Sequence, residues 1–199
     1  CAGFLKRENV ETYSKKFATI YDCITTSKGI IFVHIPYKEP AKSFCMMLEE
    51  GGYSKWNGKN FLDTGVKSNG VKYLFLTGDT SKKNLNNGIA ALNKNTNING
   101  EEIKVVIATD VAKEGLNFFN VREIHITSPW FHLNRLEQII GRGMRNCSHK
   151  NLEPEHRNVT IYYHAATIPL GYCKNSSGKR TKEPNDFGDR RNWTWDNLK

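Results

Sequence analysis

The stretch that decides the fold reads Q-I-I-G-R-G-M-R and runs from Gln138 to Arg145. In an α-helix, Gln138, Arg142 and Arg145 share one face, because residues three and four apart lie about one turn from each other. The two isoleucines point elsewhere and can be buried. Guanidinium groups stay charged and fork onto phosphate oxygens. The stretch therefore predicts a helix, from about Leu133 to Asn146, that faces a terminal phosphate; a surface helix with solvated arginines is the alternative.

A second polar stretch, A-T-D-V-A-K-E-G-L-N, lies upstream and directly follows an apolar run. Ligands of open α/β sheets sit at the carboxyl ends of strands, so Thr109 and Asp110 are expected at the edge of a site. Gly115 permits close approach of the backbone, and Asn117 can hydrogen-bond a ribose hydroxyl. This stretch predicts part of a nucleotide-binding cleft.

Together the two stretches resemble the fifth and sixth motifs of superfamily 2 helicases, written A-T-D-x-x-x-x-G-x-D/N and Q-x-x-G-R-x-x-R. The text from Arg122 to His149 is similar to helicases of large nucleocytoplasmic DNA viruses. That group contains the poxvirus early transcription factor small subunit and nucleoside triphosphate phosphohydrolase I. The resemblance covers roughly residues 28–166 and implies the C-terminal, second RecA-like domain of a helicase.

The resemblance also implies roles for single residues. Arg145 would be an arginine finger, Arg142 its partner on the terminal phosphate, and Gln138 the residue that positions the pair or the attacking water. Gly115 and Asn117 would line the nucleotide cleft, although many relatives carry aspartate where Asn117 stands. Asparagine keeps the hydrogen bond but not the charge.

Four residues fall where relatives contact the nucleic-acid backbone: Thr77, Gly78, Thr109 and Asp110. At Thr77 and Gly78, the residue types alone also favour a phosphate contact. A strand that ends in small hydroxylated residues before a helix presents backbone N–H groups to a phosphate. An ordinary helix N-cap by Thr80 or Ser81 is the alternative.

Alternating apolar runs and helical patterns predict the fold class. Five runs read as strands, at 28–34, 71–76, 103–108, 123–127 and 158–164, whereas 53–70 reads as a loop. Helical spacing is expected at 41–50, 82–92 and 133–146. We therefore predict an α/β fold, a RecA-like parallel sheet of about five to six strands with helices on both faces.

Three segments are expected along the chain: a lead-in at 1–27, the RecA-like domain at 28–170 and a polar tail or linker at 171–199. The chain begins with Cys1 and not with methionine, which suggests a fragment of a longer protein.

The amino-acid composition indicates which partners and which cellular compartment to expect. A net charge of +9, from 29 basic and 20 acidic residues, favours DNA or RNA as partner; a lysine-rich surface without a partner is the alternative. No apolar run approaches the roughly 18 residues of a membrane span, so no membrane contact is expected. The five cysteines show no C-x-x-C spacing. They predict free thiols in a reducing intracellular compartment, host cytoplasm or virion if viral, and no metal site.

A nucleoside triphosphatase also needs a phosphate loop, G-x-x-x-x-G-K-S/T, and an acidic metal site. Gly178-Lys179 fails this test, because Arg180 follows it and Gly171 precedes it by seven positions. The chain is therefore expected to hold half of a nucleotide site and to be inactive alone. ATP with Mg²⁺ would be bound mainly by an N-terminal RecA-like domain that precedes these residues.

The predicted function is the C-terminal motor domain of a superfamily 2 ATP-dependent helicase. It would supply the arginine finger and nucleic-acid contacts to an interdomain ATP site. Viral transcription machinery is a further candidate partner. One alternative is a duplex translocase or viral transcription factor ATPase that does not unwind. The other is a non-catalytic nucleic-acid-binding module, although such a module need not keep both arginines.

Overall fold

A parallel sheet forms the centre of the fold. The computed structural model describes residues 3–63, 65–110, 116–129 and 132–165, together with two short strands at 173–174 and 180–181. The sheet has six strands in the order β2-β3-β4-β1-β5-β6, and every neighbouring pair is parallel. The predicted α/β, RecA-like sheet is confirmed.

The elements follow one another mostly as alternating strands and helices. The strands are β1 (Ile30–His34), β2 (Ser54–Lys55), β3 (Lys72–Leu76), β4 (Ile103–Ala108), β5 (Val121–Ile126) and β6 (Thr160–Tyr163). The helices are α1 (Arg7–Tyr13), α2 (Lys15–Thr26), α3 (Lys38–Glu50), α4 (Lys82–Leu92) and α5 (Leu133–Gly143). Short 3-10 turns lie at Gly3–Leu5, Asn95–Asn97 and Pro154–His156.

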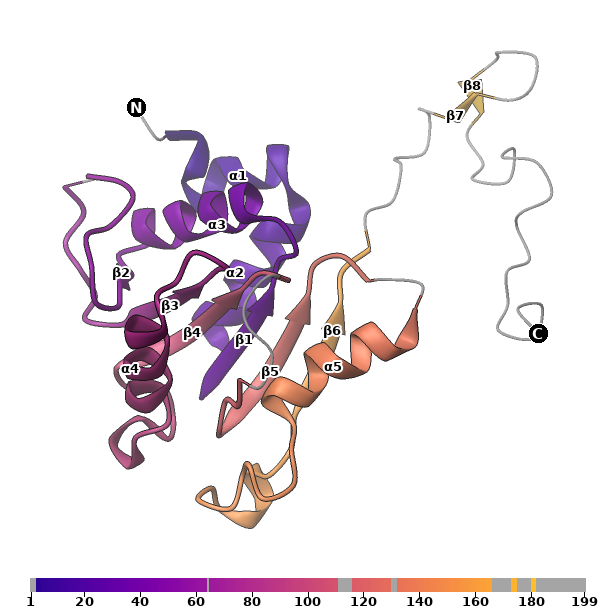
Figure 1. Ribbon diagram of the computed structural model, residues 1–199. Coiled ribbons are helices and arrows are strands. Elements are labelled where there is room, and N and C mark those ends of the chain that lie inside the picture. Colours follow the sequence, from indigo (N-terminus) through magenta and orange to yellow (C-terminus); the bar gives the residue numbers. More distant parts are fainter. Residues whose placement is uncertain are drawn as a thin grey trace. The chain divides into compact units, whose positions relative to one another are not determined.

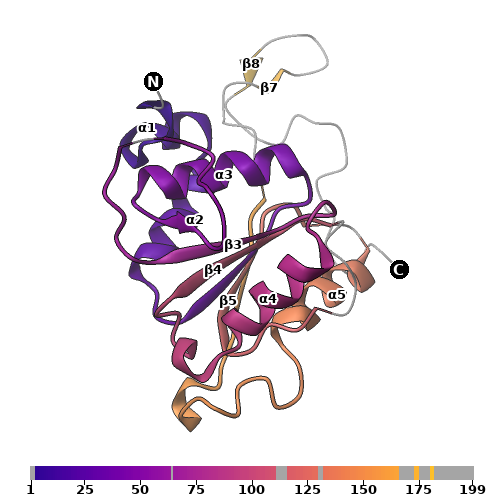
Figure 2. The same cartoon turned by 60° about the vertical axis from the view of Figure 1, so that its left-hand side comes forward.

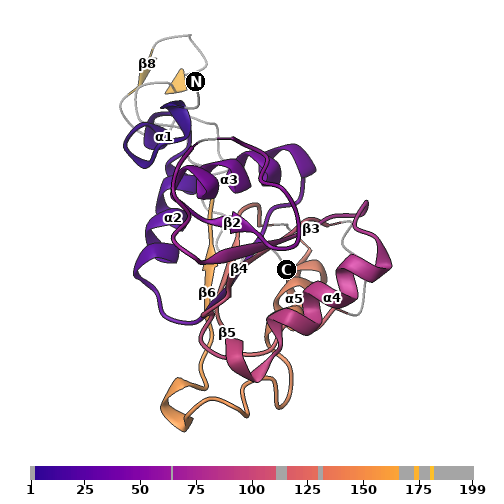
Figure 3. The same cartoon turned by 90° about the vertical axis from the view of Figure 1, so that its left-hand side faces the viewer.

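Helices cover both faces of the sheet, because both faces of its central strand are apolar. All five residues of β1 are buried. Ile30 and Phe32 belong to the core beneath α4 and α5, whereas Ile31 and Val33 belong to the core beneath α1, α2 and α3. Figure 1 and the turned views of Figures 2 and 3 show these two helical layers with the sheet between them. Strands buried on both faces are typical of parallel sheets.

Most predicted elements match the structure, and the differences have local causes. Helix α3 begins at Lys38, earlier than predicted, because Pro40 is tolerated in a first turn that has no partner for its N–H. Ser81 caps α4 by accepting a hydrogen bond from the N–H of Asn84 at 3.3 Å. Strand β2, which lies in the predicted loop, has two residues and no periodicity to reveal it.

The first residues of the chain are part of the domain's core. Leu5 and Val10 are buried, and so are Ile20 and Ile24 of α2. Ser14 caps α2 by accepting a hydrogen bond from the N–H of Phe17 at 3.2 Å. The chain divides into two compact units, Cys1–Ala165 and Ala166–Lys199. In the second unit, β7 (Cys173–Lys174) pairs antiparallel with β8 (Arg180–Thr181).

A buried amide holds the connection between α4 and β4. Asn97 is 1% exposed, and its Nδ2 donates to the carbonyls of Leu92 (3.0 Å) and Ile103 (3.1 Å). Its Oδ1 accepts from the backbone N–H groups of Glu102 (2.9 Å) and Ile103 (2.8 Å). One side chain thus satisfies four backbone groups where the chain enters a central strand.

Replacing Asn97 should therefore destabilise the domain. Asn97→Ala leaves buried backbone donors and acceptors without partners, and we expect a loss of roughly 2–4 kcal/mol of unfolding free energy. Chemical denaturation measures this change. Asn95→Ala, at an exposed asparagine of the same turn, is the matched control and should change stability by less than about 0.5 kcal/mol. Equal stability of the two variants would contradict the proposed role of Asn97.

Candidate functional site

The carboxyl ends of the central strands meet at one edge of the sheet. Backbone pairing continues past the strands: the N–H of Thr109 donates to the carbonyl of Leu76, and the N–H of Thr127 donates to the carbonyl of His34, both at 3.1 Å. Parallel strands bring their last residues together in this way. His34 and Asp110, which end or follow two adjacent strands, therefore lie beside each other.

A pocket of about 620 Å³, called pocket one, opens where this edge meets α5. Its lining residues come from β1, from the segment after β4 and from α5: His34, Asp110, His132, Leu133, Asn134, Arg135, Gln138, Ile139 and Arg142. Of the predicted site residues, Asp110, Gln138 and Arg142 meet here. The predicted amide and one of the two predicted guanidiniums thus face a common space.

The carboxylate of Asp110 joins strand and helix inside pocket one. Its Oδ1 lies 2.9 Å from Nε2 of His34 at the end of β1. Its Oδ2 accepts a hydrogen bond from the Arg135 guanidinium in the first turn of α5. Bonds to a charged guanidinium are stronger than neutral ones. Asp110 therefore holds α5 in position against the sheet edge.

Burial makes the His34 ring neutral. The side chain is 2% exposed, and desolvation lowers the pKa of His34 from 6.5 to about 4. The Asp110 carboxylate opposes this shift, whereas the nearby Arg142 and Arg135 guanidiniums add to it. The Nδ1 atom of His34 is buried and has no hydrogen-bond partner among the described residues. At neutral pH, pocket one therefore has an uncharged imidazole on its floor.

Helix α5 presents the predicted apolar back and polar front. Leu136 and Ile139 are buried in the core against β5, and Ile140 packs partly against it. Gln138 is exposed and Arg142 is half-buried, both on the pocket side. Residues four apart on a helix lie above one another, which explains why these two side chains share the pocket.

Arg145 lies elsewhere, because α5 is shorter than predicted. The helix ends at Gly143, and Met144 leaves it with φ −130° and ψ 88°. Gly141 and Gly143 explain this end, since each glycine weakens a helix by about 1 kcal/mol relative to alanine. Arg145 therefore does not share the helix face of Arg142. It is exposed, and its Nε donates to the carbonyl of Gly141 at 3.0 Å.

The two glycines have different surroundings. A Cβ at Gly143 would lie 3.2 Å from Cδ1 of Ile124 and 3.3 Å from Cγ1 of Val121, so this glycine lets α5 pack closely on β5. A Cβ at Gly141 would have no described atom of the surroundings within 4 Å. The space beside Arg142 is therefore open at Gly141, where a ligand can approach.

A second pocket of about 340 Å³, called pocket two, lies at the end of β3. Its lining includes two lysines, three aromatic rings, three hydroxylated residues and one carboxylate: Lys38, Lys55, Trp56, Phe61, Phe75, Thr77, Thr80, Ser81 and Asp79. The ammonium of Lys38 donates a hydrogen bond to the carboxylate of Asp79 at 2.5 Å. The Nζ of Lys55 lies 4.2 Å from the ring centroid of Phe61. Basic groups interleaved with aromatic rings suit a nucleic-acid strand, because phosphates and bases are bound by different parts of the surface.

The predicted nucleic-acid residues do not form one group. Thr77 lines pocket two, where its N–H donates to Oγ1 of Thr80 at 3.0 Å and Gly78 beside it is exposed. Thr109 is buried beyond the end of β4, and Asp110 lies in pocket one. The helix N-cap that was the alternative is present at Ser81.

Residues 15–147 match the family described as the helicase conserved C-terminal domain. The chain belongs to this family. It is 32% identical over 162 residues to a protein of Acanthamoeba polyphaga mimivirus named as an ATP-dependent RNA helicase, covering 80% of the chain and 27% of the relative. It is 36% identical over 101 residues to the early transcription factor large subunit homolog of African swine fever virus, covering 51% of the chain and 9% of the relative.

These relatives confirm the predicted resemblance to helicases of large DNA viruses, although this chain covers only about a quarter or less of their length. Among solved structures, the E. coli DEAD-box protein SrmB bound to RraA superposes with a TM-score of 0.52 at 18% identity. The match covers 75% of this chain and 69% of that one, and it supports the RecA-like fold. Over the residues that the structure describes, every helix is too short or too polar to cross a bilayer.

Two residues of pocket one were not predicted. His34 and Arg135 both contact Asp110, but they lie far apart in the sequence and belong to neither helicase motif used above. The sequence held one weak signal for His34, which is the polar residue at the end of an otherwise apolar strand. Thr77 and Thr109 occupy similar positions, because each directly follows an apolar strand. Arg135 has no such signal, because a basic residue in a first helical turn is usually a solvated side chain.

The predicted cleft residues after β4 are only partly visible. Gly115 lies outside the described residues. Asn117 is half-buried, and its side-chain oxygen has no hydrogen-bond partner among the described residues, while its backbone carbonyl accepts from Asn93 at 3.1 Å. The roles of Gly115 and Asn117 stay predictions.

The buried His34 should make the helicase domain less stable in mild acid. The unfolded chain takes up a proton near the usual pKa of 6.5, whereas folded His34 does so only near 4, so protonation favours unfolding between these values. We expect unfolding free energy to fall as pH drops from 6.5 to 4, with a contribution from this residue of about 2–3 kcal/mol.

Urea denaturation across this pH range measures the effect. His34→Gln should flatten the curve; part of the slope should remain, because burial also lowers the pKa of His164 to about 4. His156→Gln, at an exposed histidine, is the control and should leave the slope unchanged. An unchanged slope in His34→Gln would contradict the neutral, buried state of this ring.

Proposed function

We propose that this domain supplies the second half of an ATP site that forms between two RecA-like domains of a nucleic-acid helicase. The observation that carries the proposal is pocket one, where Gln138 and Arg142 face a common space at the carboxyl edge of a parallel sheet. Crevices at this edge are the usual ligand sites of such folds. An N-terminal RecA-like domain would hold most of the ATP and its Mg²⁺, and this domain would close over the terminal phosphate.

Arg142 is suited to a terminal phosphate by its setting. It is half-buried, and the nearby His34 ring is neutral, so that ring adds no second positive charge that would repel the guanidinium. The open surface at Gly141 leaves room for a polyphosphate. Electrostatic stabilisation is strongest where water is excluded. Gln138, one turn earlier, would position Arg142 or the attacking water.

Arg145 is our proposed arginine finger, and it must change position to act. Its guanidinium is exposed and donates to the carbonyl of Gly141. A single hydrogen bond of this kind contributes only about 0.5–1.5 kcal/mol, so closure of the two domains can exchange it for a phosphate contact. The finger would therefore engage only in the closed state, in which hydrolysis occurs.

Asp110 is proposed to position other residues. A carboxylate repels phosphate, and both oxygens of Asp110 already contact His34 and Arg135. Direct contact with a nucleic-acid backbone, as the resemblance implied, fits Thr77 and Gly78 better. We therefore propose pocket two, with Lys55, as the place where the backbone binds; Lys38 in the same pocket is paired with Asp79.

A second function is supported by one relative. The African swine fever virus protein carries the name of a transcription factor subunit, so an ATPase that translocates on duplex without unwinding remains a candidate. A strand-displacement assay on the full-length protein separates the two functions. Nucleic-acid-stimulated hydrolysis without displacement would favour the translocase.

Removing the finger should slow turnover much more than it weakens nucleotide binding. In the complete two-domain protein, we expect Arg145→Ala to reduce kcat about 10³-fold or more, because a finger stabilises charge that develops in the transition state. Arg145→Lys should restore little, since an ammonium cannot fork onto two oxygens. Steady-state ATPase assays and nucleotide titrations measure both effects.

Two controls accompany this experiment. Arg157→Ala removes a guanidinium that contacts the Leu152 and Lys150 carbonyls outside both pockets, and should leave kcat within a few-fold of the parent. The isolated 199-residue chain should hydrolyse no ATP. A turnover of Arg145→Ala close to that of the parent would rule out the finger; stimulated hydrolysis by the isolated chain would rule out the shared site.

Nucleic-acid binding should be weak, independent of sequence and sensitive to salt, because the contacts go mainly to phosphates. Thr77→Ala should cost roughly 1 kcal/mol, the size of one hydrogen bond. Lys55→Gln should lower the salt slope by about one phosphate contact. Lys150→Gln removes the same charge outside pocket two and should change the slope less. Fluorescence anisotropy against salt measures all three, and equal effects of the two lysine variants would exclude pocket two.

A further inference from the structure

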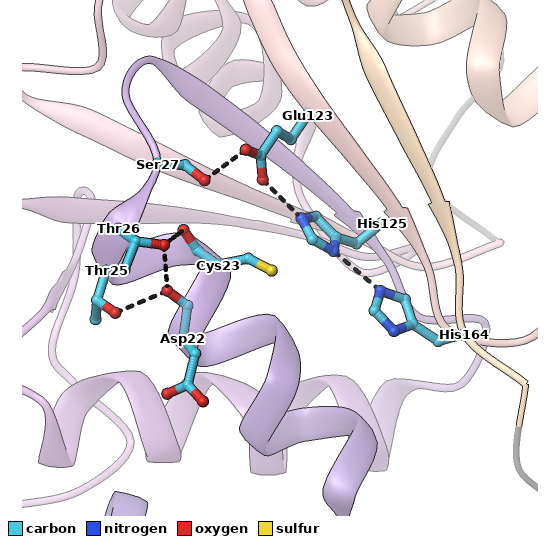
Figure 4. Close-up of polar contacts among 8 residues, drawn as sticks. All are labelled: Asp22, Cys23, Thr25, Thr26, Ser27, Glu123, His125 and His164. Atoms are coloured by element: carbon cyan, nitrogen blue, oxygen red, sulfur yellow. Dashed lines mark hydrogen bonds and ion pairs between the residues drawn. The ribbon is translucent and has the colours of Figure 1, made fainter.

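A cluster of metal-binding side chains lies away from both pockets, between α2 and β5. The Sγ of Cys23, a carboxylate oxygen of Glu123 and a ring nitrogen of His125 all lie within 4.8 Å of one another. Figure 4 shows the Cys23 thiol pointing from α2 toward the ring of His125 and the carboxylate of Glu123. Thiolate, imidazole and carboxylate are the usual ligands of Zn²⁺.

The topology explains why these groups converge. Glu123 and His125 are two residues apart on β5, so both side chains leave the same face of the sheet. Ile124 and Ile126 point to the other face, into the core beneath α5. The cluster therefore occupies the face covered by α2, whereas pocket one belongs to α5.

Hydrogen bonds around the cluster hold the ligand atoms in place. Nε2 of His125 lies 3.1 Å from Oε2 of Glu123, and Nδ1 of His125 lies 3.0 Å from Nε2 of His164. The other carboxylate oxygen of Glu123 accepts from the hydroxyl of Ser27. The His125 ring is fully buried and stacks on Tyr162, with ring centroids 4.7 Å apart and planes 13° apart. Such outer contacts orient the ligands of metal sites.

The tautomers allow two states of this chain of contacts. A proton on Nε2 of His125 would be donated to Glu123, and Nδ1 would accept from His164. A proton on Nδ1 would instead be donated to His164, which leaves the lone pair of Nε2 directed at a carboxylate oxygen. Two acceptors facing each other need a cation between them. The second state is the one in which His125 can bind a metal.

We propose that Cys23, Glu123 and His125 bind one Zn²⁺ ion through Sγ, Oε2 and Nε2, with water in the fourth position. Zinc distances of about 2.3 Å to sulfur and 2.0–2.2 Å to nitrogen and oxygen place tetrahedral ligand atoms about 3.4–3.6 Å apart. The 3.1 Å between Nε2 and Oε2 already approaches this spacing. The thiol lies close to this spacing, because one ligand atom of each of the three residues lies within 4.8 Å of the other two.

Charge also fits the ion. Binding replaces the thiol proton, which passes to solvent, so the site gains a thiolate beside the Glu123 carboxylate. These two negative charges match the two positive charges of Zn²⁺. The match matters here, because Lys104 and Lys16 carry positive charge near Glu123 and His164. The anionic ligands offset the repulsion between these lysines and the dication.

The bound ion would link α2 directly to β5. It would join residues 23, 123 and 125, a hundred positions apart, and so fasten the first helices to the sheet. This site was not predicted from the sequence, because its ligands follow no zinc spacing. The distance along the chain between α2 and β5 conceals what the parallel sheet brings together.

Cobalt and zinc titrations of the chelator-treated 199-residue chain test the proposal. We expect one equivalent of Co²⁺ to give a thiolate-to-metal absorption band in the near ultraviolet, and Zn²⁺ to abolish it by competition. Zn²⁺ at 100 times its Kd should raise Tm by about 5 °C or more. Cys23→Ser should lose the band and the Tm shift. Cys147→Ser removes an exposed free thiol outside the cluster and should keep both.

Two further variants make the test decisive. His164→Gln should keep the band but weaken binding by about 10- to 100-fold, as expected of a residue that orients a ligand. Glu123→Gln should weaken binding even if Cys23→Ser fails to fold, because the amide retains the hydrogen-bonding shape without the charge. A band that persists in Cys23→Ser, unchanged affinity in Glu123→Gln, or no band and no Tm shift in the parent chain would overturn the proposal.

Discussion

Parallel pairing of β1 with β4 and β5 is the constraint on which the rest of the structure depends. It buries β1 on both faces, so helices must cover each side, and it brings the carboxyl ends of the strands to one edge. His34 and Asp110 contact each other for this reason. Asp110 then holds Arg135, and through it the helix that carries Gln138 and Arg142. A backbone constraint thus places the polar side chains of pocket one.

Most of the fold could be predicted from the sequence, because parallel strands buried on both faces leave clear apolar runs. Helix α4 was predicted with its bounds and with a cap at Thr80 or Ser81, and Ser81 is the cap, since capping signals are local. The end of α5 was not, because the pattern of apolar residues continues past Gly143 while the backbone does not. Strand β2 was also missed, as two residues carry no period. Local chemistry revealed the elements, and tertiary packing decided their ends.

The site could be predicted only in part. Gln138, Arg142 and Asp110 were found through the helicase motifs, and pocket one brings them together. His34 and Arg135 were missed because their importance lies in contacts with Asp110, which no spacing encodes. The same reason concealed the cluster around His125, whose partners come from α2, β5 and the residue after β6. Motifs identify functional residues that lie in one stretch of sequence. Residues that are distant in sequence but close in space can be identified only from the fold.

The central position of β1 also sets the order in which the domain can fold. β1 is completed at His34 during synthesis, but its two partners end only at Ala108 and Ile126. The apolar residues of β1 therefore stay unpaired with β4 and β5 until most of the domain has been synthesised. Pairings between distant segments form slowly and expose apolar strands to aggregation meanwhile. Helices α2 and α3, which flank β1 in sequence, can cover one of its faces before β4 and β5 are synthesised.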